Sequence, residues 1–207
     1  MAVLCFLDND VILKLVACSL FAEAISSLGV TNNELRVLDT AKPVFRNSSK
    51  VKRKYLSEIL NTAIEIVQQC QSVYPENSAV FKTLQQFDGI DLGEATLISA
   101  MLQENAFWFV TGDKRCLSVI ANEPQLVEIR EKLKGRVVCL EYLILKVLSV
   151  HGFGFVQEKV LPAIEYDTTL KSCFGSGMQA TRENVVLSLE GYISDLKRNS
   201  GDLLVDW

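Results

Sequence analysis

The chain has 207 residues, of which 49% are hydrophobic and 22% are charged, and this balance is typical of folded globular proteins rather than disordered or fibrous ones. Its length suits one domain, or one domain with an appendage. The net charge of -4 excludes the overall positive field that marks many nucleic-acid-binding proteins, although a local basic patch is compatible with that total.

The first predicted element is the apolar run at residues 2–7, which reads as a strand buried on both faces. The acidic turn that follows, Asp8-Asn9-Asp10, supplies candidate N-caps for a helix. From Val11 the apolar residues keep helical spacing until Gly29, a plausible C-terminal stop. The sequence therefore predicts a strand followed by one helix.

A second short strand is predicted at residues 35–38, with Thr40 capping another helix. Residues 51–71 have the pattern of one amphipathic helix, in which the phase of Tyr55 points to the core. A further short helix ends near Phe87. The turn-rich segment that follows it leads into the next helix.

That next helix carries the apolar residues of 95–102. The run FWFV at 107–110 predicts a strand, and Thr-Gly-Asp-Lys follows it at 111–114. The last clear strand is expected at 136–140, with a helix over 141–150 after it.

Short apolar strands alternate with helices through the first 150 residues, which favours a parallel sheet because parallel neighbours need crossover connections. We therefore expect an α/β fold of three layers, α/β/α, with helices on both faces of a small parallel sheet. The predicted domain covers residues 1–150 and includes a helical insertion at about 41–88. Residues 151–207 are expected to form a helical C-terminal extension without obvious strands, which ends in an amphipathic helix over 182–198.

Histidine is nearly absent, because His151 is the only one in the chain. Ser–His–Asp triads and mixed His/Cys metal sites need at least one well-placed imidazole. His151 precedes a glycine, a position typical of a helix C-terminus. If the protein is an enzyme, we expect carboxylates to do its chemistry.

The cysteines contain no Cys-x-x-Cys pair and mostly lie in apolar runs, which favours buried, reduced thiols in a cytoplasmic protein over a disulfide framework or a zinc site. No uncharged apolar stretch approaches the roughly 20 residues that a membrane helix needs. The apolar N-terminal segment lacks a basic leader and is interrupted by charges, so export is not expected. The six cysteines are Cys5, Cys18, Cys70, Cys116, Cys139 and Cys173.

Acidic residues fall where predicted strands end: Asp8 after the first, Asp113 after the FWFV strand and Glu141 after the last. In open parallel sheets, ligands bind outside the carboxyl ends of the strands. Carboxylates crowded there repel one another, and a hard cation such as Mg²⁺ can neutralise them. The sequence therefore points to a divalent-metal site at this edge, which can act on a phosphodiester without any histidine.

Three segments form a recognisable set: FLDNDVILKL from Phe6, DLGEATLISAML from Asp91 and FWFVTGDKR from Phe107. In this order they resemble the first strand and helix, the Gly-Glu-Ala helix, and the strand followed by Thr-x-Asp of the PIN-domain ribonuclease family. The resemblance spans roughly Val3 to Val150. It implies a divalent-metal-dependent ribonuclease with Mg²⁺ or Mn²⁺, often the toxin of a toxin–antitoxin pair, and hence an RNA substrate and an antitoxin protein as partners.

Matched residue by residue, the resemblance makes Asp8, Glu94 and Asp113 the metal-binding acids. Thr111 matches the hydroxyl position beside the third acid, and Asp10 would line the pocket and is a further candidate metal ligand.

One departure from the family concerns a fourth acid. Where many members place a further acid two residues after the third, this chain has Arg115, and Glu141 is a geometric candidate for the missing carboxylate.

A basic segment between the predicted second strand and the long helix is a candidate RNA-binding surface. A solvated start to that helix explains it equally well. The apolar stripe of the last helix is compatible with internal packing, with a homodimer seam or with an antitoxin-binding face. The basic residues are Arg46, Lys50, Lys52, Arg53 and Lys54.

Two other functions remain open. In a haloacid-dehalogenase-like phosphohydrolase, a strand ending in Asp-x-Asp would supply Asp8 as nucleophile and Asp10 as its acid–base partner, but Glu94 would have no role. Alternatively, Arg115 suggests a catalytically degenerate PIN-like module that binds RNA or protein without cleavage.

Overall fold

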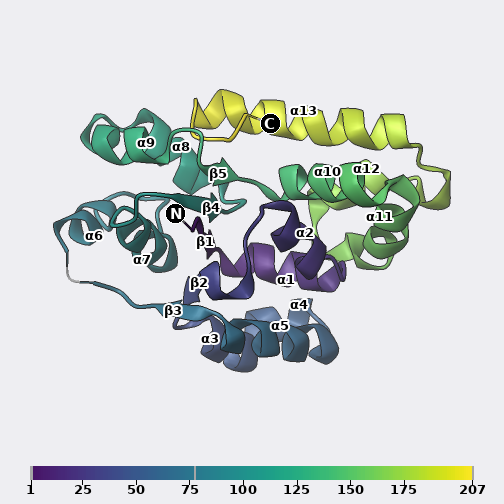
Figure 1. Ribbon diagram of the computed structural model, residues 1–207, viewed down its shortest axis with the longest axis horizontal. Coiled ribbons are helices and arrows are strands. Elements are labelled where there is room, and N and C mark those ends of the chain that lie inside the picture. Colours follow the sequence, from purple (N-terminus) through teal and green to yellow (C-terminus); the bar gives the residue numbers. More distant parts are fainter. Residues whose placement is uncertain (1, 77, 207) are drawn as a thin grey trace.

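The structure is a computed structural model that describes residues 2–76 and 78–206. A five-stranded, fully parallel sheet forms the centre of the molecule. Helices α6 and α7 lie on one side of the strands, and α1 and α2 lie on the other (Figure 1). The architecture is α/β, as predicted, and is consistent with three layers. The strands are β1 (Leu4–Leu7), β2 (Leu35–Leu38), β3 (Gln71–Val73), β4 (Phe107–Val110) and β5 (Val137–Val138).

The described residues contain thirteen α-helices, separated in places by short 3-10 turns such as η3 (Leu161–Tyr166). In chain order the α-helices are α1 (Asn9–Ala17), α2 (Phe21–Ser27), α3 (Ala41–Asn47), α4 (Ser49–Lys54), α5 (Ser57–Gln69), α6 (Ala79–Leu84), α7 (Leu92–Met101), α8 (Lys114–Asn122), α9 (Val127–Leu133), α10 (Leu140–His151), α11 (Phe153–Val160), α12 (Thr168–Phe174) and α13 (Arg182–Ser200).

The strand order is β3-β2-β1-β4-β5, so the chain starts in the middle of the sheet. It first builds outward through β2 and β3, and then returns to the other side of β1 to add β4 and β5. The register pairs Leu7 of β1 with Val37 of β2 and with Val110 of β4. Three of the four β1 residues, Cys5, Phe6 and Leu7, are buried because a central strand with helices on both faces has no solvent side.

The helix predicted from Val11 to Gly29 is wrong as a single element, because the chain forms two helices, α1 and α2. Ser19 takes a left-handed conformation with φ of 50°, its N–H donates to Val16 O, and the Leu20 N–H donates to Leu15 O. These two bonds are the ones that close a helix C-terminus in a Schellman motif. The spacing of the apolar residues did not reveal the break at Ser19, because α1 and α2 both carry buried residues.

The helix predicted at 51–71 is likewise two helices, because Tyr55 and Leu56 are extended between α4 and α5. Tyr55 is buried, as its phase predicted, and its ring stacks on Tyr166 with centroids 4.9 Å apart. The segment at 41–88 is also not purely helical, since β3 within it pairs with β2. Two of the three β3 residues are exposed, so no apolar run marked this strand.

The C-terminal region packs closely on the sheet domain. Helix α13 lies along α8 and α10 (Figure 1). Beyond it the chain returns to the sheet: the Val137 N–H donates to Leu203 O, the Val205 N–H donates to Val137 O, and Leu204 forms a parallel bridge with Val137. Apart from this isolated bridge, residues 151–206 form no strand, as predicted. The division at residue 150 stays a prediction.

Other features agree with expectation. His151 is the last residue of α10, and all six cysteines are free, five of them buried and Cys70 half-buried. Across residues 2–76 and 78–206, no helix is both long and apolar enough to cross a membrane.

The C-terminal contact predicts a large stability effect. Leu204 is 2% exposed, so Leu204→Ala should lower the free energy of unfolding by about 2–5 kcal/mol through lost burial and a residual cavity. Leu187 on α13 is 70% exposed, and Leu187→Ala should change it by no more than about 0.5 kcal/mol. Urea unfolding of both variants measures the difference. Equal effects would show that the C-terminal segment is not docked on β5.

Candidate functional site

The candidate site lies where the strand order changes direction, between the carboxyl ends of β1 and β4. Asp8 follows β1, and its N–H donates to Val110 O at 3.0 Å. Thr111 follows β4, and its N–H donates to Val138 O at 3.1 Å. The sheet therefore fixes the backbone of both residues. Such a switch point is the usual ligand-binding position in open α/β sheets.

Thr111 connects two of the predicted acids. Its buried hydroxyl lies 3.5 Å from Asp8 Oδ2, to which it donates, and it accepts the Asp113 N–H at 3.2 Å. Asp113 caps α8, because its Oδ1 accepts the N–H groups of Arg115 at 2.8 Å and of Cys116 at 3.1 Å. The cap fixes the position of the Asp113 carboxylate next to the Thr111–Asp8 contact.

Glu94 reaches the site from α7 and is held by a residue that the sequence reasoning did not select. Asp91 Oδ1 accepts the Glu94 N–H at 2.8 Å, and Glu94 Oε2 accepts the Asp91 N–H at 2.7 Å. This reciprocal pair is a capping box, and the signal for it, Asp-x-x-Glu before an apolar run, is present in the sequence. Between them, a Cβ on Gly93 would lie 2.9 Å from Leu38 Cδ1, so a larger residue there would require the Leu38 side chain to move.

The acids act on one another electrostatically. Burial raises the pKa of Asp8 to about 6, and the charges of Asp10 and Asp91 add to this, while backbone N–H groups at the start of α1 oppose it. Burial also raises the pKa of Glu94 to about 8; the Asp91 N–H opposes this, and the charges of Asp113, Asp91 and Asp8 contribute to it. Asp10 acts on Asp8, whereas the acids that act on Glu94 are Asp8, Asp91 and Asp113. We call Glu94 and these three acids the acid cluster.

The carboxylate of Asp10 contacts lysine side chains. It pairs with Lys14 Nζ at 2.5 Å and lies 4.0 Å from Lys54 Nζ. Lys14 also pairs at 2.7 Å with Asp167, which caps α12. The structure therefore gives Asp10 ion-pair partners and makes it a neighbour of the acid cluster.

Glu141, the predicted candidate for the fourth acid, lies near the thiols of Cys139 and Cys173. It lies in the first turn of α10, and its charge adds to the effect of burial in raising the pKa values of Cys139 and Cys173. The fourth acid that the structure brings close to Asp8 and Glu94 is thus Asp91.

The donor set fits a hard divalent cation in its chemistry, since it is made of carboxylate oxygens. Within residues 2–76 and 78–206, however, no three His, Cys, Asp or Glu side chains converge closely enough to hold a metal ion. Capping occupies part of Glu94 and Asp113, and each carboxylate retains further acceptor capacity. Next to Asp8, the buried Asn9 Oδ1 has no hydrogen-bond partner among the described residues.

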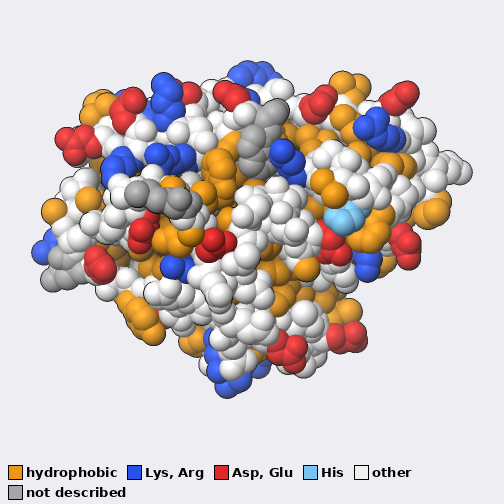
Figure 2. Space-filling model, viewed as in Figure 1, with side chains coloured by type: hydrophobic (Ala, Val, Ile, Leu, Met, Phe, Trp, Pro, Cys, Tyr) orange, Lys and Arg blue, Asp and Glu red, His pale blue; other side chains and the backbone are white. Residues whose placement is uncertain are grey.

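The basic segment lies on the end of α3 and along α4, on the β2–β3 side of the molecule. Arg46 and Lys52 line a cavity of about 590 Å³, together with Tyr55 and residues of α5. Lys54, at the end of α4, is the member closest to Asp10. Figure 2 shows Lys and Arg side chains gathered at the foot of the view, in the region of α3.

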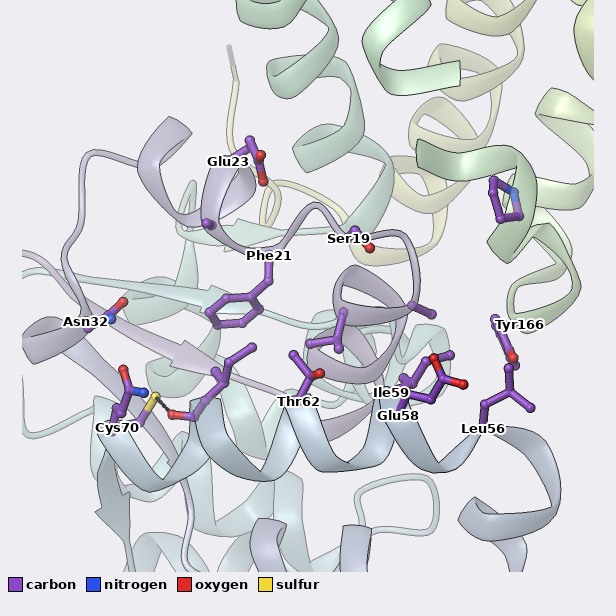
Figure 3. Close-up of a pocket in the computed structure, with 16 residues that line it drawn as sticks. Ser19, Phe21, Glu23, Asn32, Leu56, Glu58, Ile59, Thr62, Cys70 and Tyr166 are labelled. Carbon is purple, nitrogen blue, oxygen red and sulfur yellow. Dashed lines mark hydrogen bonds between the residues drawn. The ribbon is translucent and has the colours of Figure 1, made fainter. Parts of the chain in front are cut away.

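A separate, more apolar cavity of about 690 Å³ lies between α2, α5 and η3. Phe21 points from α2 toward α5, and Ile59 and Thr62 face it from α5 (Figure 3). The cavity is lined by neither Asp8 nor Glu94, so the acid cluster and this cavity are different sites.

Comparisons of the chain with protein-family models, with curated proteins and with solved structures find no match.

The acid cluster predicts a pH-dependent stability of the metal-free protein. Because the pKa values of Asp8 and Glu94 rise from 3.8 and 4.5 to about 6 and about 8, the folded chain binds more protons than the unfolded chain in this range. These two groups should therefore destabilise the fold as the pH rises from about 4 to about 8. Asp8→Asn should raise the unfolding free energy at pH 8 by about 1–3 kcal/mol, measured in EDTA by urea unfolding.

Asp202→Asn is the matched control, because Lys134 holds the pKa of Asp202 below its ordinary value and this variant should gain no stability at pH 8. A loss of stability in Asp8→Asn at pH 8, relative to the unchanged protein, would contradict the repulsion ascribed to the cluster.

Proposed function

We propose that the protein is a divalent-metal-dependent ribonuclease with a PIN-like site, which hydrolyses RNA phosphodiester bonds at the acid cluster. The observation that carries the proposal is the convergence of three chain segments at the β1–β4 switch point. Asp8, the Asp91–Glu94 cap and Asp113 share one electrostatic environment there, with burial and mutual repulsion raising the pKa of Asp8 and Glu94. Such an arrangement destabilises the chain alone and favours a bound cation.

The absence of a ready three-ligand group within the described residues is compatible with Mg²⁺ or Mn²⁺. Mg²⁺ keeps several waters and is commonly bound through one or two carboxylates together with substrate phosphate oxygens. Asp8, Glu94 and Asp113 are the residues that would hold it, with the RNA supplying other oxygens. When bound, the ion supplies charge stabilisation for the phosphodiester and an activated water.

The chain's own residues have distinct parts in this proposal. Thr111 orients Asp8, and the N-terminus of α8 orients Asp113. Asp91 fixes Glu94 at the start of α7. With a pKa of about 6, Asp8 is ionised near neutral pH and is still basic enough to accept a proton.

The position of Asp10 favours a nuclease over a haloacid-dehalogenase-like phosphohydrolase. In that reaction Asp10 would act on the substrate beside Asp8, whereas its carboxylate is paired with Lys14 and lies 4.0 Å from Lys54. It also leaves Glu94 unused, although Glu94 is buried in the cluster with Asp8. An antitoxin partner and a homodimer remain predictions from the sequence.

The proposal predicts cleavage of a labelled single-stranded RNA in Mg²⁺ or Mn²⁺ and its loss in EDTA. Asp8→Asn and Glu94→Gln should each lower the rate at least about 100-fold, because each replaces a carboxyl group that would hold the cation with a neutral amide. Glu128→Gln is the control: Glu128 is also in the first turn of a helix, α9, but is exposed, and its loss should leave the rate unchanged. Gel analysis of the products measures all three.

Equal rates for the unchanged protein and Asp8→Asn would overturn the mechanism. Hydrolysis of a phosphomonoester that depends on Asp8 and Asp10 but not on Glu94 would establish the phosphohydrolase instead. RNA binding without cleavage in either metal would establish the non-catalytic module.

A further inference from the structure

Arg115 stands where the family pattern places a further acid, and the structure shows what surrounds it. Its Nη2 lies 3.4 Å from Asp113 Oδ2, and its side chain is 81% exposed. An exposed ion pair of this length contributes little stability. The guanidinium is therefore held at the edge of the acid cluster while most of its surface faces solvent.

Arg115 also lines an open groove of about 560 Å³ next to the acid cluster. Lys114, Arg115 and Ser118 of α8 form one wall, and Asn199 near the end of α13 contributes to the other. Figure 1 shows α8 and α13 side by side, and Figure 2 shows Lys and Arg side chains over α8 and α9. The C-terminal region therefore builds part of a surface that continues from the candidate site.

A turn at Asp88 and Gly89 closes one end of the groove and is packed tightly on α8. Gly89 has φ of 100°, a conformation that favours glycine, and a Cβ there would lie 3.2 Å from Val119 Cγ2. Two residues later the chain reaches Asp91 of the capping box. Both sides of the groove are therefore connected to the acid cluster along the chain. Helix α8 follows Asp113 directly, and the turn at Asp88 and Gly89 precedes Asp91.

Two exposed cations, Lys114 and Arg115, line the groove together with one acid, Asp88, and the ion pairs around it are loose. Lys114 Nζ lies 3.7 Å from Asp195 Oδ2, and Arg198 Nη2 lies 3.8 Å from Asp195 Oδ1. The side chains of Lys114 and Arg198 are 48% and 77% exposed. Lys114 and Arg198 thus share Asp195, and Arg115 pairs with Asp113. Exposed pairs of this kind are weak, so their cations exchange readily to another anion.

We propose that this groove binds the phosphodiester backbone of the RNA strand beside the bond that is cut, with Arg115 and Lys114 contacting phosphate oxygens. The inference rests on the proposed function and adds a second basic surface to it. The α4 segment approaches the site beside Asp10, and Arg115 approaches it beside Asp113. A polyanion that crosses the acid cluster meets repulsion there, and cations on both sides offset it.

The test is equilibrium binding of a fluorescently labelled single-stranded RNA, by fluorescence anisotropy in EDTA over a range of NaCl concentrations. For single strands, each phosphate contact contributes about 0.7 to the slope of log affinity against log salt. Arg115→Gln and Lys114→Gln should each reduce the slope by about 0.7 and weaken binding about fivefold at 0.1 M salt. Both residues are exposed, so neither change should disturb folding.

Lys134→Gln is the matched control, because Lys134 is likewise an exposed lysine in an ion pair, at 2.6 Å from Asp202 on the C-terminal side of α9. It should leave affinity and slope unchanged. Slopes for Arg115→Gln and Lys114→Gln that equal those of the unchanged protein and of Lys134→Gln would overturn the groove proposal.

Binding in EDTA separates this proposal from the ribonuclease itself. If the slopes change as expected but the protein cleaves no RNA in Mg²⁺ or Mn²⁺, the groove stands and the ribonuclease proposal fails. If RNA is cleaved while Arg115→Gln and Lys114→Gln alter neither the binding slope nor KM, the ribonuclease stands and the groove proposal fails.

Discussion

The parallel pairing of β1 with β4 is the constraint on which the candidate site depends. Asp8 and Thr111 are 103 residues apart in the chain, and only this pairing brings the hydroxyl to 3.5 Å from the carboxylate. The strand order places the same two strand ends at the switch point of the sheet. The approach of Glu94 and the capping of α8 by Asp113 then fill the remaining sides of the site.

The burial of these acids lowers the stability of the fold, and packing elsewhere in the molecule offsets this loss. Burial and mutual repulsion raise the pKa of Asp8 and Glu94, so their ionised forms oppose folding near neutral pH. The apolar packing of β1 between two helical layers and the docking of residues 203–205 on β5 oppose this cost. A site that destabilises its own fold when empty is typical of a place where a ligand supplies the compensating interaction.

Much of this was predictable from the sequence, and the failures have specific physical causes. Three of the five strands, β1, β4 and β5, carried continuous apolar runs, and the acids that follow β1 and β4 marked the site. The strand β3 was missed because only one of its three residues is buried. The break at Ser19 depends on backbone hydrogen bonds that leave no gap in the apolar spacing. Asp91 was overlooked because a capping residue and a member of an acidic site look alike until the packing of α7 against the sheet is known.

In the proposed ribonuclease, Asp8 together with Glu94 or Asp113 would bind one divalent cation. Crystals soaked in millimolar Mn²⁺ with a non-hydrolysable RNA fragment, measured by anomalous diffraction, test it most directly. We predict an anomalous peak in contact with Asp8 and with Glu94 or Asp113. A peak held by Asp8 and Asp10 without Glu94, or no peak at the β1–β4 strand ends, would contradict the account.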